Sequence, residues 1–236
     1  MRVGRRNASA LGLAGVWLAF SGACFAQTTP LAIVPVEGAT LTGALNVADG
    51  KAMIGASGSI AAGDHALTAM LPHRGNLRVC ATTKVSLAAD SSVAASVTES
   101  ETPAQATPDA PGLMLGLERG ALEGNFATGK NSDVILTPEF RILISSPGTA
   151  QVRVRLGDKG DTCVDNGGPN PPYVTVSSVF DGGAYRVQPG QRVMFQHGSL
   201  TEVVDNEPES CGCPPEPAAA ARGRSEERRV GKECLE

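Results

Sequence analysis

Short runs of apolar and β-branched residues, separated by turn residues, recur along most of the chain. In residues 151–156, apolar side chains alternate with Arg153 and Arg155, which is typical of a strand with one face in water. Residues 140–145 alternate in the same way but place Leu143 on the second face, which predicts a central strand buried on both sides. Patterns of helical period are scarce. The chain therefore predicts an all-β fold.

The predicted strands are short and are bounded by Gly, Pro, Asn and Asp, as in β-sandwiches and barrels. Asp49-Gly50 favours a tight hairpin, and Pro189-Gly190 favours a type II turn. We expect an antiparallel β-sandwich or a barrel-like domain. Its predicted strands cover residues 44–47, 51–54, 66–70, 76–80, 84–87, 113–117, 121–126, 133–136, 140–145, 150–156, 173–177, 183–187 and 192–196.

The N-terminus has the composition of an export signal. Three arginines precede an apolar run at 11–20, and small residues follow this run up to Ala26. About ten apolar residues are too few to span a bilayer, but they match the central region of a signal peptide. We predict a signal peptide over residues 1–26 and a periplasmic or secreted protein of the bacterial envelope. The alternative is a lipoprotein in which Cys24 carries the lipid and is retained.

Composition shifts divide the rest of the chain. Residues 27–42 are predicted as a mobile N-terminal segment, and residues 43–207 as the all-β domain. Within this domain, residues 98–112 are polar and contain several prolines, which favours a long exposed loop. Residues 208–221 are rich in Cys, Pro and Ala and predict a linker that leaves the domain.

The charge-dense C-terminus is set aside from the fold. Residues 224–234 resemble the translation of a sequencing adapter, so we interpret residues 222–236 as an artefactual tail; the alternative is a basic solvated tail. Without this tail and the signal peptide, Lys and Arg fall from 20 to 12 and Asp and Glu from 24 to 20, which leaves a net charge of -8. Such a surface favours neither nucleic acid nor anionic lipid.

Four cysteines remain in this body: Cys80, Cys163, Cys211 and Cys213. An even number of cysteines in an exported chain favours disulfides. A bond between Cys211 and Cys213 would close a ring across one residue, which is hard to reach without strain. We expect each of these two cysteines to pair with Cys80 or Cys163, in either arrangement, so that the segment after Glu202 is fastened across the sheet. A zinc or copper site built from the four thiols is the alternative.

Several segments, in order along the chain, resemble the FecR-like domains of bacterial envelope proteins. They are residues 58–64, 75–87, 112–122 and 184–191, the last with a Pro-Gly-Gln turn before a strand. Residues 77–80, 137–144, 160–164 and 211–214 also look like a group of exported bacterial proteins. The resemblance implies an all-β fold outside the cytoplasm, and it transfers no catalytic residue.

Candidate chemical groups favour solvated roles. His65, His73 and His197 lie near turns at spacings unsuited to a shared metal, so we expect surface histidines. Small residues at 55–59 are predicted as a turn and lack the serine-nucleophile motif. Two groups of acidic residues could supply oxygen ligands for calcium, but we expect them to be solvated side chains in turns. They are Asp158, Asp161 and Asp165, and Asp205, Glu207 and Glu209. We therefore predict no metal, no cofactor and no enzymatic activity.

The function expected from the sequence is that of a non-catalytic exported β-domain that binds a partner or has a structural role. The partner is an envelope protein or a glycan. The alternative is a carbohydrate-binding or polysaccharide-active β-sandwich. The single Trp lies in the predicted signal peptide, and only Tyr173 and Tyr185 remain for stacking against sugars, which favours the first reading.

Overall fold

A computed structural model describes residues 29–90, 112–145, 147–180 and 182–215 of the chain. The predicted signal peptide, nearly all of the predicted 98–112 loop and the predicted artefactual tail lie outside these residues. The described part is almost entirely β, as predicted. Its only helical element is a short 3-10 turn at Asp158–Gly160.

Sixteen strands form one hydrogen-bonded sheet. They are β1 (Ala32–Pro35), β2 (Ala39–Ala48), β3 (Lys51–Ala62), β4 (Leu67–Leu71), β5 (Gly75–Val79), β6 (Lys84–Asp90), β7 (Gly112–Arg119), β8 (Ala121–Thr128), β9 (Asp133–Leu136), β10 (Phe140–Ser145), β11 (Gly148–Leu156), β12 (Thr162–Gly167), β13 (Tyr173–Ser178), β14 (Ala184–Val187), β15 (Arg192–Phe195) and β16 (Val203–Asp205).

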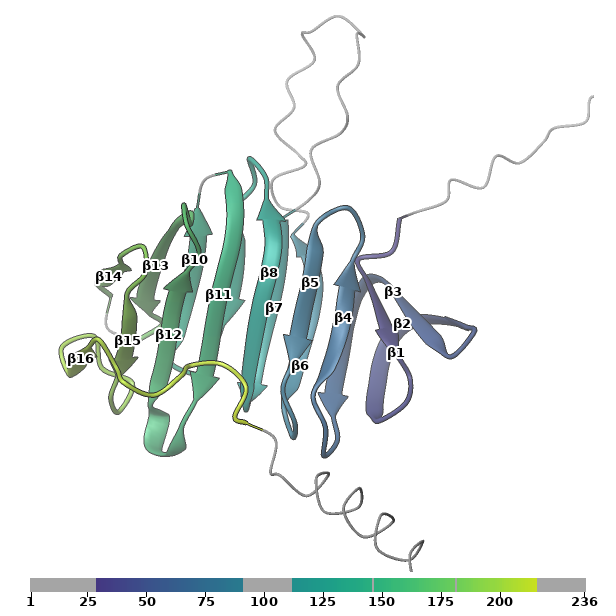
Figure 1. The fold of residues 1–236 in the computed structure, drawn as a ribbon, viewed down its shortest axis with the longest axis horizontal. Helices are drawn as coiled ribbons and strands as arrows, with labels where there is room; N and C mark the ends of the chain where they lie inside the picture. The colour runs from purple at the N-terminus through teal and green to yellow at the C-terminus, as the bar shows by residue number, and fades with distance from the viewer. Residues whose placement is uncertain (1–28, 91–111, 146, 181, 216–236) are drawn as a thin grey trace, which may run out of the picture.

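The sheet folds back on itself into two layers (Figure 1). The front layer runs β4-β5-β8-β11-β12-β15-β16, and the back layer runs β6-β7-β9-β10-β13-β14. The sheet is not closed, because β14 and β16 do not pair with each other. The barrel alternative is therefore wrong, and the layers form an open sandwich.

One strand pair also corrects the expectation of a purely antiparallel sheet. Strands β7 and β9 pair in parallel, whereas the other strand pairs are antiparallel. Between them the chain runs through β8, which belongs to the front layer and pairs with β5 and β11. Strand β8 thus acts as the crossover connection that a parallel pair needs.

Strand β3 joins the two layers. Its first part pairs with β1, and its second part, from Ser57 onward, pairs with β6. The small residues 55–59, predicted as a turn, lie inside this strand, so that prediction is wrong. Gly43 of β2 pairs with Gly58 of β3, and a Cβ on Gly58 would lie 2.9 Å from the carbonyl oxygen of Thr42. Glycine at this point lets the two backbones approach where β3 bends.

The core lies between the layers and is mostly aliphatic. In β11, Val152 and Val154 are buried while Arg153 points away from the core, as predicted. In β10, Phe140, Ile142 and Ile144 are fully buried, but Leu143 on the other face is only half-buried. The prediction that residues 140–145 are buried on both sides is therefore wrong, because the outer face of the back layer is open to water.

The N-terminal segment is also more ordered than predicted. Within residues 27–42, expected to be mobile, β1 pairs with both β3 and β4 and buries Ala32 and Val34 completely. Strand β2 begins at Ala39 and pairs with β3. This part of the segment belongs to the sheet because its alternating small apolar side chains fill the end of the core.

Candidate functional site

Charged side chains of alternating sign cross the outer face of the front layer. Backbone register places Arg78 of β5 beside Glu123 of β8, then Arg153 of β11, Asp165 of β12 and Arg192 of β15. We call this row the charge ladder. Directly opposed residues on neighbouring strands lie about 5 Å apart, so opposite charges in this row attract across each pair.

Asp165 is the most buried member of the charge ladder. Its side chain is only 7% exposed, and its Oδ2 accepts hydrogen bonds from Arg153 Nη1 at 2.9 Å and from Arg192 Nε at 3.4 Å. Two guanidinium groups therefore compensate one buried carboxylate. Arg78 and Glu123 form a looser ion pair at 3.5 Å.

Residues 207–213 run across the outer face of the front layer, and we call them the C-terminal strap. In Figure 1 the strap leaves β16 and passes in front of β12 and β11. Arg192 Nη1 donates to the carbonyl oxygens of Glu207 and Pro208 at 3.1 and 3.2 Å. Arg192 thus links the charge ladder to the strap.

The far end of the strap is also held by charged groups. Arg155 Nη2 donates to Glu209 at 3.3 Å. Glu123 Oε1 accepts the backbone N–H of Cys213 at 2.9 Å, while its Oε2 faces Arg78. A Cβ on Gly212 would collide with Glu123, so the strap lies directly on the sheet.

Two disulfides fix the strap covalently. Cys80, which follows β5, pairs with Cys213, and Cys163 of β12 pairs with Cys211. Their Cα separations are 5.1 and 5.2 Å. This agrees with the prediction that each strap cysteine joins the body, and it selects one of the two arrangements left open. Cys163 lies within β12 and is fully buried.

The predicted linker at 208–221 is wrong for its first part. Cys211 is fully buried and Gly212 is buried beside it. The Cys-, Pro- and Ala-rich composition of this region indicates a linker, but the disulfides and the backbone contacts of the strap hold its first part on the sheet.

A row of side-chain amides lies next to the charge ladder. Asn76 of β5 faces Asn125 of β8, which faces Gln151 of β11, and we call these three residues the amide row. Their amides make no hydrogen bond to any residue that the structure describes. With Thr68 and the ladder residues of the same strands, they line a shallow depression of about 390 Å³, the polar shelf.

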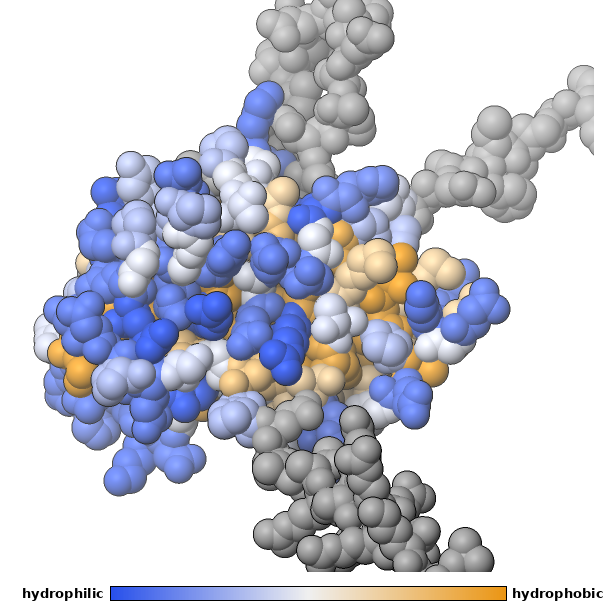
Figure 2. Space-filling view, in the orientation of Figure 1, coloured by the Kyte–Doolittle hydropathy of each residue, from blue (hydrophilic) through white to orange (hydrophobic). Residues whose placement is uncertain are grey.

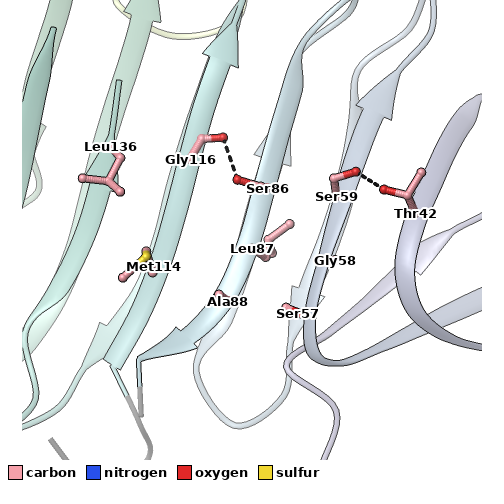
Figure 3. A pocket seen from close by; sticks show the side chains of 10 residues that line it. All are labelled: Thr42, Ser57, Gly58, Ser59, Ser86, Leu87, Ala88, Met114, Gly116 and Leu136. Carbon is pink, nitrogen blue, oxygen red and sulfur yellow. Dashed lines mark hydrogen bonds between the residues drawn. The ribbon is translucent and has the colours of Figure 1, made fainter. Parts of the chain in front are cut away.

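A second depression lies on the outer face of the back layer (Figure 3). Its lining is uncharged and combines small residues with Leu87, Met114 and Leu136, and its volume is about 330 Å³. Ser86 Oγ donates to the carbonyl oxygen of Gly116 at 3.4 Å, and the hydroxyls of Thr42 and Ser59 are hydrogen-bonded. These polar groups are already paired, so this trough offers fewer free hydrogen-bonding groups than the polar shelf.

The edges β14 and β16 are linked by side chains. The Tyr185 hydroxyl donates to Asp205 Oδ1 at 2.6 Å, and Gln191 Nε2 contacts both groups at 3.0 and 2.9 Å. The hydrogen bond to Asp205, with burial as a smaller cause, raises the pKa of Tyr185. The Tyr185 ring packs edge-on against Phe195, which contacts Phe140. At this end of the sandwich the two layers are thus joined by side-chain contacts, without backbone pairing between β14 and β16.

The predicted acidic groups do not come together as clusters. Asp165 contacts the two arginines of the charge ladder, while Asp161 Oδ1 accepts the backbone N–H of His197 at 2.9 Å. In the second group, Asp205 contacts Tyr185 and Glu209 contacts Arg155. Across the described ranges, no group of three or more His, Cys, Asp or Glu side chains is placed to hold a metal ion.

The three predicted surface histidines are all exposed: His65, His73 and His197. His197 Nδ1 lies 2.8 Å from Glu202 Oε2. None of the helical structure in the described part of the chain is long and apolar enough to cross a membrane.

No family model matches the chain, and no curated protein matches it. The polar shelf and the charge ladder are therefore defined from geometry alone. Sequence reasoning missed both, although each contributing strand carries two polar residues two positions apart on its wet face: Asn76 and Arg78, Glu123 and Asn125, and Gln151 and Arg153. This pattern was visible, but the strand order that joins the pairs was not.

Proposed function

We propose that the chain is a non-catalytic, exported β module of the FecR-like type that binds a partner in the bacterial envelope or outside the cell. The polar shelf is its binding surface. Export is supported by the two disulfides, which persist in oxidising compartments such as the periplasm. N-terminal sequencing of the exported protein tests this part, and a start at Gln27 is the expected result.

The amide row is the observation that carries the binding proposal. Asn76 and Asn125 are exposed, and Gln151 is half-buried. A side-chain amide has two N–H donors and an accepting oxygen, so three adjacent amides present a dense array of both kinds of group. The charge ladder beside them is already paired, which fixes the surface around the row and leaves the amides available to a ligand.

The partner is an envelope protein or a glycan, and the chemistry of the amide row favours a glycan as the second of these candidates. Sugar hydroxyls both donate and accept hydrogen bonds, as the amides do. The exposed Tyr173 lies on β13 of the back layer, where Arg186 stacks on its ring at 4.8 Å, so sugar stacking on this ring is not part of the shelf. Recognition on the shelf would rest on hydrogen bonds.

Binding assays with matched variants test the proposal. The mature protein is applied to arrays of bacterial polysaccharides and to immobilised envelope proteins. The N125A/Q151A variant is expected to lose about tenfold or more in affinity, since each lost hydrogen bond contributes about 0.5–1.5 kcal/mol. Thr175→Ala on the back layer is the control and should bind normally. Equal binding by the shelf variant and the wild type would contradict the proposal.

A further inference from the structure

The edges of the sheet differ in how they are protected. Strand β14 has four residues and carries Arg186, and β16 has three residues and carries Asp205. Short length and charge are features by which natural proteins discourage pairing at an edge. Strand β2, which lies off the main path of the sheet, has ten residues and contains neither a charged residue nor proline.

Strand β2 pairs only with β3 among the described strands. Its other edge therefore presents backbone N–H and C=O groups that face outward. Residues 39–43 and 45–48 of β2 both pair with β3. The register shifts between Gly43 and Leu45, and the extra residues at this shift lie in β3. The backbone of β2 is irregular at Gly43, whose φ is +105°, and the two extended parts on either side of it are templates for one more strand.

We propose that β2 pairs antiparallel with β2 of a second copy, forming a twofold dimer. With the axis near Gly43, Leu41 of one copy faces Leu45 of the other, and Thr40 faces Asn46. Leu41 and Leu45 are half-buried in the single chain and pair with Ile60 and Ile54 of β3. The dimer would bring the leucines of both copies together on one face and the polar residues together on the other.

The side chains around β2 favour a second copy as the occupant. Because β2 carries no charge, two copies of it meet without repulsion, although each chain has a formal net charge of -4. On the outer face of the sheet, Met70 of β4 is 53% exposed, and Ile33, which faces both Met70 and Met53, continues this partly exposed apolar row towards β2. The row ends at Asn46 of β2, which faces Met53, while the 59% exposed Val47 lies on the opposite face beside Ala52. Figure 2 shows hydrophobic surface at this end, around β4 and β1.

Geometry limits both the size and the strength of this dimer. A twofold pairing uses the β2 edge of both copies, so it closes without forming a fibre. One pair of ten-residue strands buries less than about 1,200 Å², which is the range of weak and transient complexes. We expect a dimer that forms at about 10–500 μM and dissociates on dilution.

Sedimentation velocity of the oxidised full-length mature protein tests the dimer. Wild type should pass from monomer to dimer over this concentration range. Thr40 and Asn46 are exposed, so the T40K/N46K variant places lysines opposite each other and should weaken the dimer about tenfold or more. Ala184→Lys on β14 is the matched control at another edge, and it should leave the dimer unchanged.

Charge reversal separates a blocked edge from a damaged fold. T40K/N46K and T40E/N46E should each be monomeric alone and should form a mixed dimer when combined at equal concentration. Failure of the mixture to dimerise would overturn the proposal. So would wild type that stays monomeric throughout, a dimer that persists in T40K/N46K, or a dimer lost in A184K. This inference does not depend on what the polar shelf binds.

Discussion

The two ends of the sandwich are stabilised by different interactions. At the end formed by β12, β14, β15 and β16, which we call the fastened end, an aromatic cluster, the Tyr185–Asp205 hydrogen bond and the Cys163–Cys211 disulfide act together. At the open end, formed by β1, β2 and the first part of β3, the sequence has neither aromatic residues nor cysteines. Packing there relies on Ala, Val, Ile, Leu and Met, and on backbone pairing.

This difference separates the part of the sheet that is cross-linked by disulfides from the part whose edge is open to pairing with another strand. The C-terminal strap runs from the fastened end across the front layer, where two disulfides bond it to the sheet. A force on the C-terminus therefore acts on the cross-linked sheet before it acts on the short edge strand β16. The open end has an unprotected edge instead. We expect perturbations of the fastened end to have large effects on stability and those of the open end to act mainly on association.

Removal of the disulfides and truncation of the aromatic cluster should have the two largest effects, which we expect to be of similar size. The bonds span 133 and 48 residues, for which chain entropy gives about 5 and about 4 kcal/mol. We expect the C80S/C213S and C163S/C211S variants each to lose about 2–5 kcal/mol in the free energy of unfolding, measured by urea denaturation. Peptide mapping without reductant provides the control, and a Cys211–Cys213 bond or four free thiols would contradict the account.

Truncation of the aromatic cluster should have an effect of similar size. Phe195 is fully buried between Phe140 and Tyr185, so Phe195→Ala is expected to cost about 3–5 kcal/mol by loss of apolar burial and creation of a cavity. Met70→Ala on β4, next to the open end, should change stability by less than about 0.5 kcal/mol, because its side chain is already exposed. Similar losses in both variants would remove the contrast between the two ends.

Loss of charge in the ladder should have an intermediate effect. Asp165→Asn keeps the shape of a buried side chain but removes the charge that two arginines contact, and it should cost about 1–3 kcal/mol. Glu118→Gln breaks the exposed Lys84–Glu118 pair, which is 2.6 Å long, and should cost at most about 1 kcal/mol. Thermal unfolding of both variants would reveal the difference, and an equal cost would show that Asp165 acts as a surface charge.

Removal of the Tyr185 hydroxyl should have the smallest effect on the free energy of unfolding, and this effect should decrease at alkaline pH. Because the folded protein raises the pKa of Tyr185, its neutral form stabilises the fold below about pH 10, and this stabilisation is lost as the pH rises through the raised pKa. Tyr185→Phe should cost about 0.5–1.5 kcal/mol at neutral pH through the lost hydrogen bond to Asp205. The gap between wild type and variant should narrow above pH 10 in urea denaturation. A constant gap would contradict the link between titration and folding.

The regular part of the fold could be predicted from the sequence. Residues 133–136 and 140–145 were predicted as strands, and the structure has β9 and β10 with the same bounds. Alternation is sufficient for β10 because one of its faces is buried and the other is not, whereas β9 is a short apolar run buried on both faces. Strand β12 was missed because Asp165 and Asn166 interrupt its apolar pattern. Both are buried with partners, and Asn166 Nδ2 donates to the carbonyl oxygens of Pro172 and Val187 at 3.3 Å.

The candidate site needed information that the sequence does not carry. Local patterns indicate which residues of β5, β8 and β11 face water. These three strands are spread over residues 75–156, however, and they become neighbours only through the strand order β5-β8-β11. The amide row and the charge ladder depend on that order and on its register. By contrast, the sequence was sufficient to predict that Cys211 and Cys213 each bond to Cys80 or Cys163. A bond between Cys211 and Cys213 themselves is disfavoured by local covalent geometry.

Native-state hydrogen exchange tests the contrast between the strap and β2 most directly. In the oxidised protein at low concentration, the Cys213 amide, which donates to Glu123, and the amides of β12 should exchange only through global unfolding. The outward amides of β2, which have no strand partner in the monomer, should exchange at least about 100-fold faster. Reduction of the disulfides should release the strap but leave β2 unchanged. A strap that exchanges freely in the oxidised protein, or a β2 as protected as β12, would contradict the account.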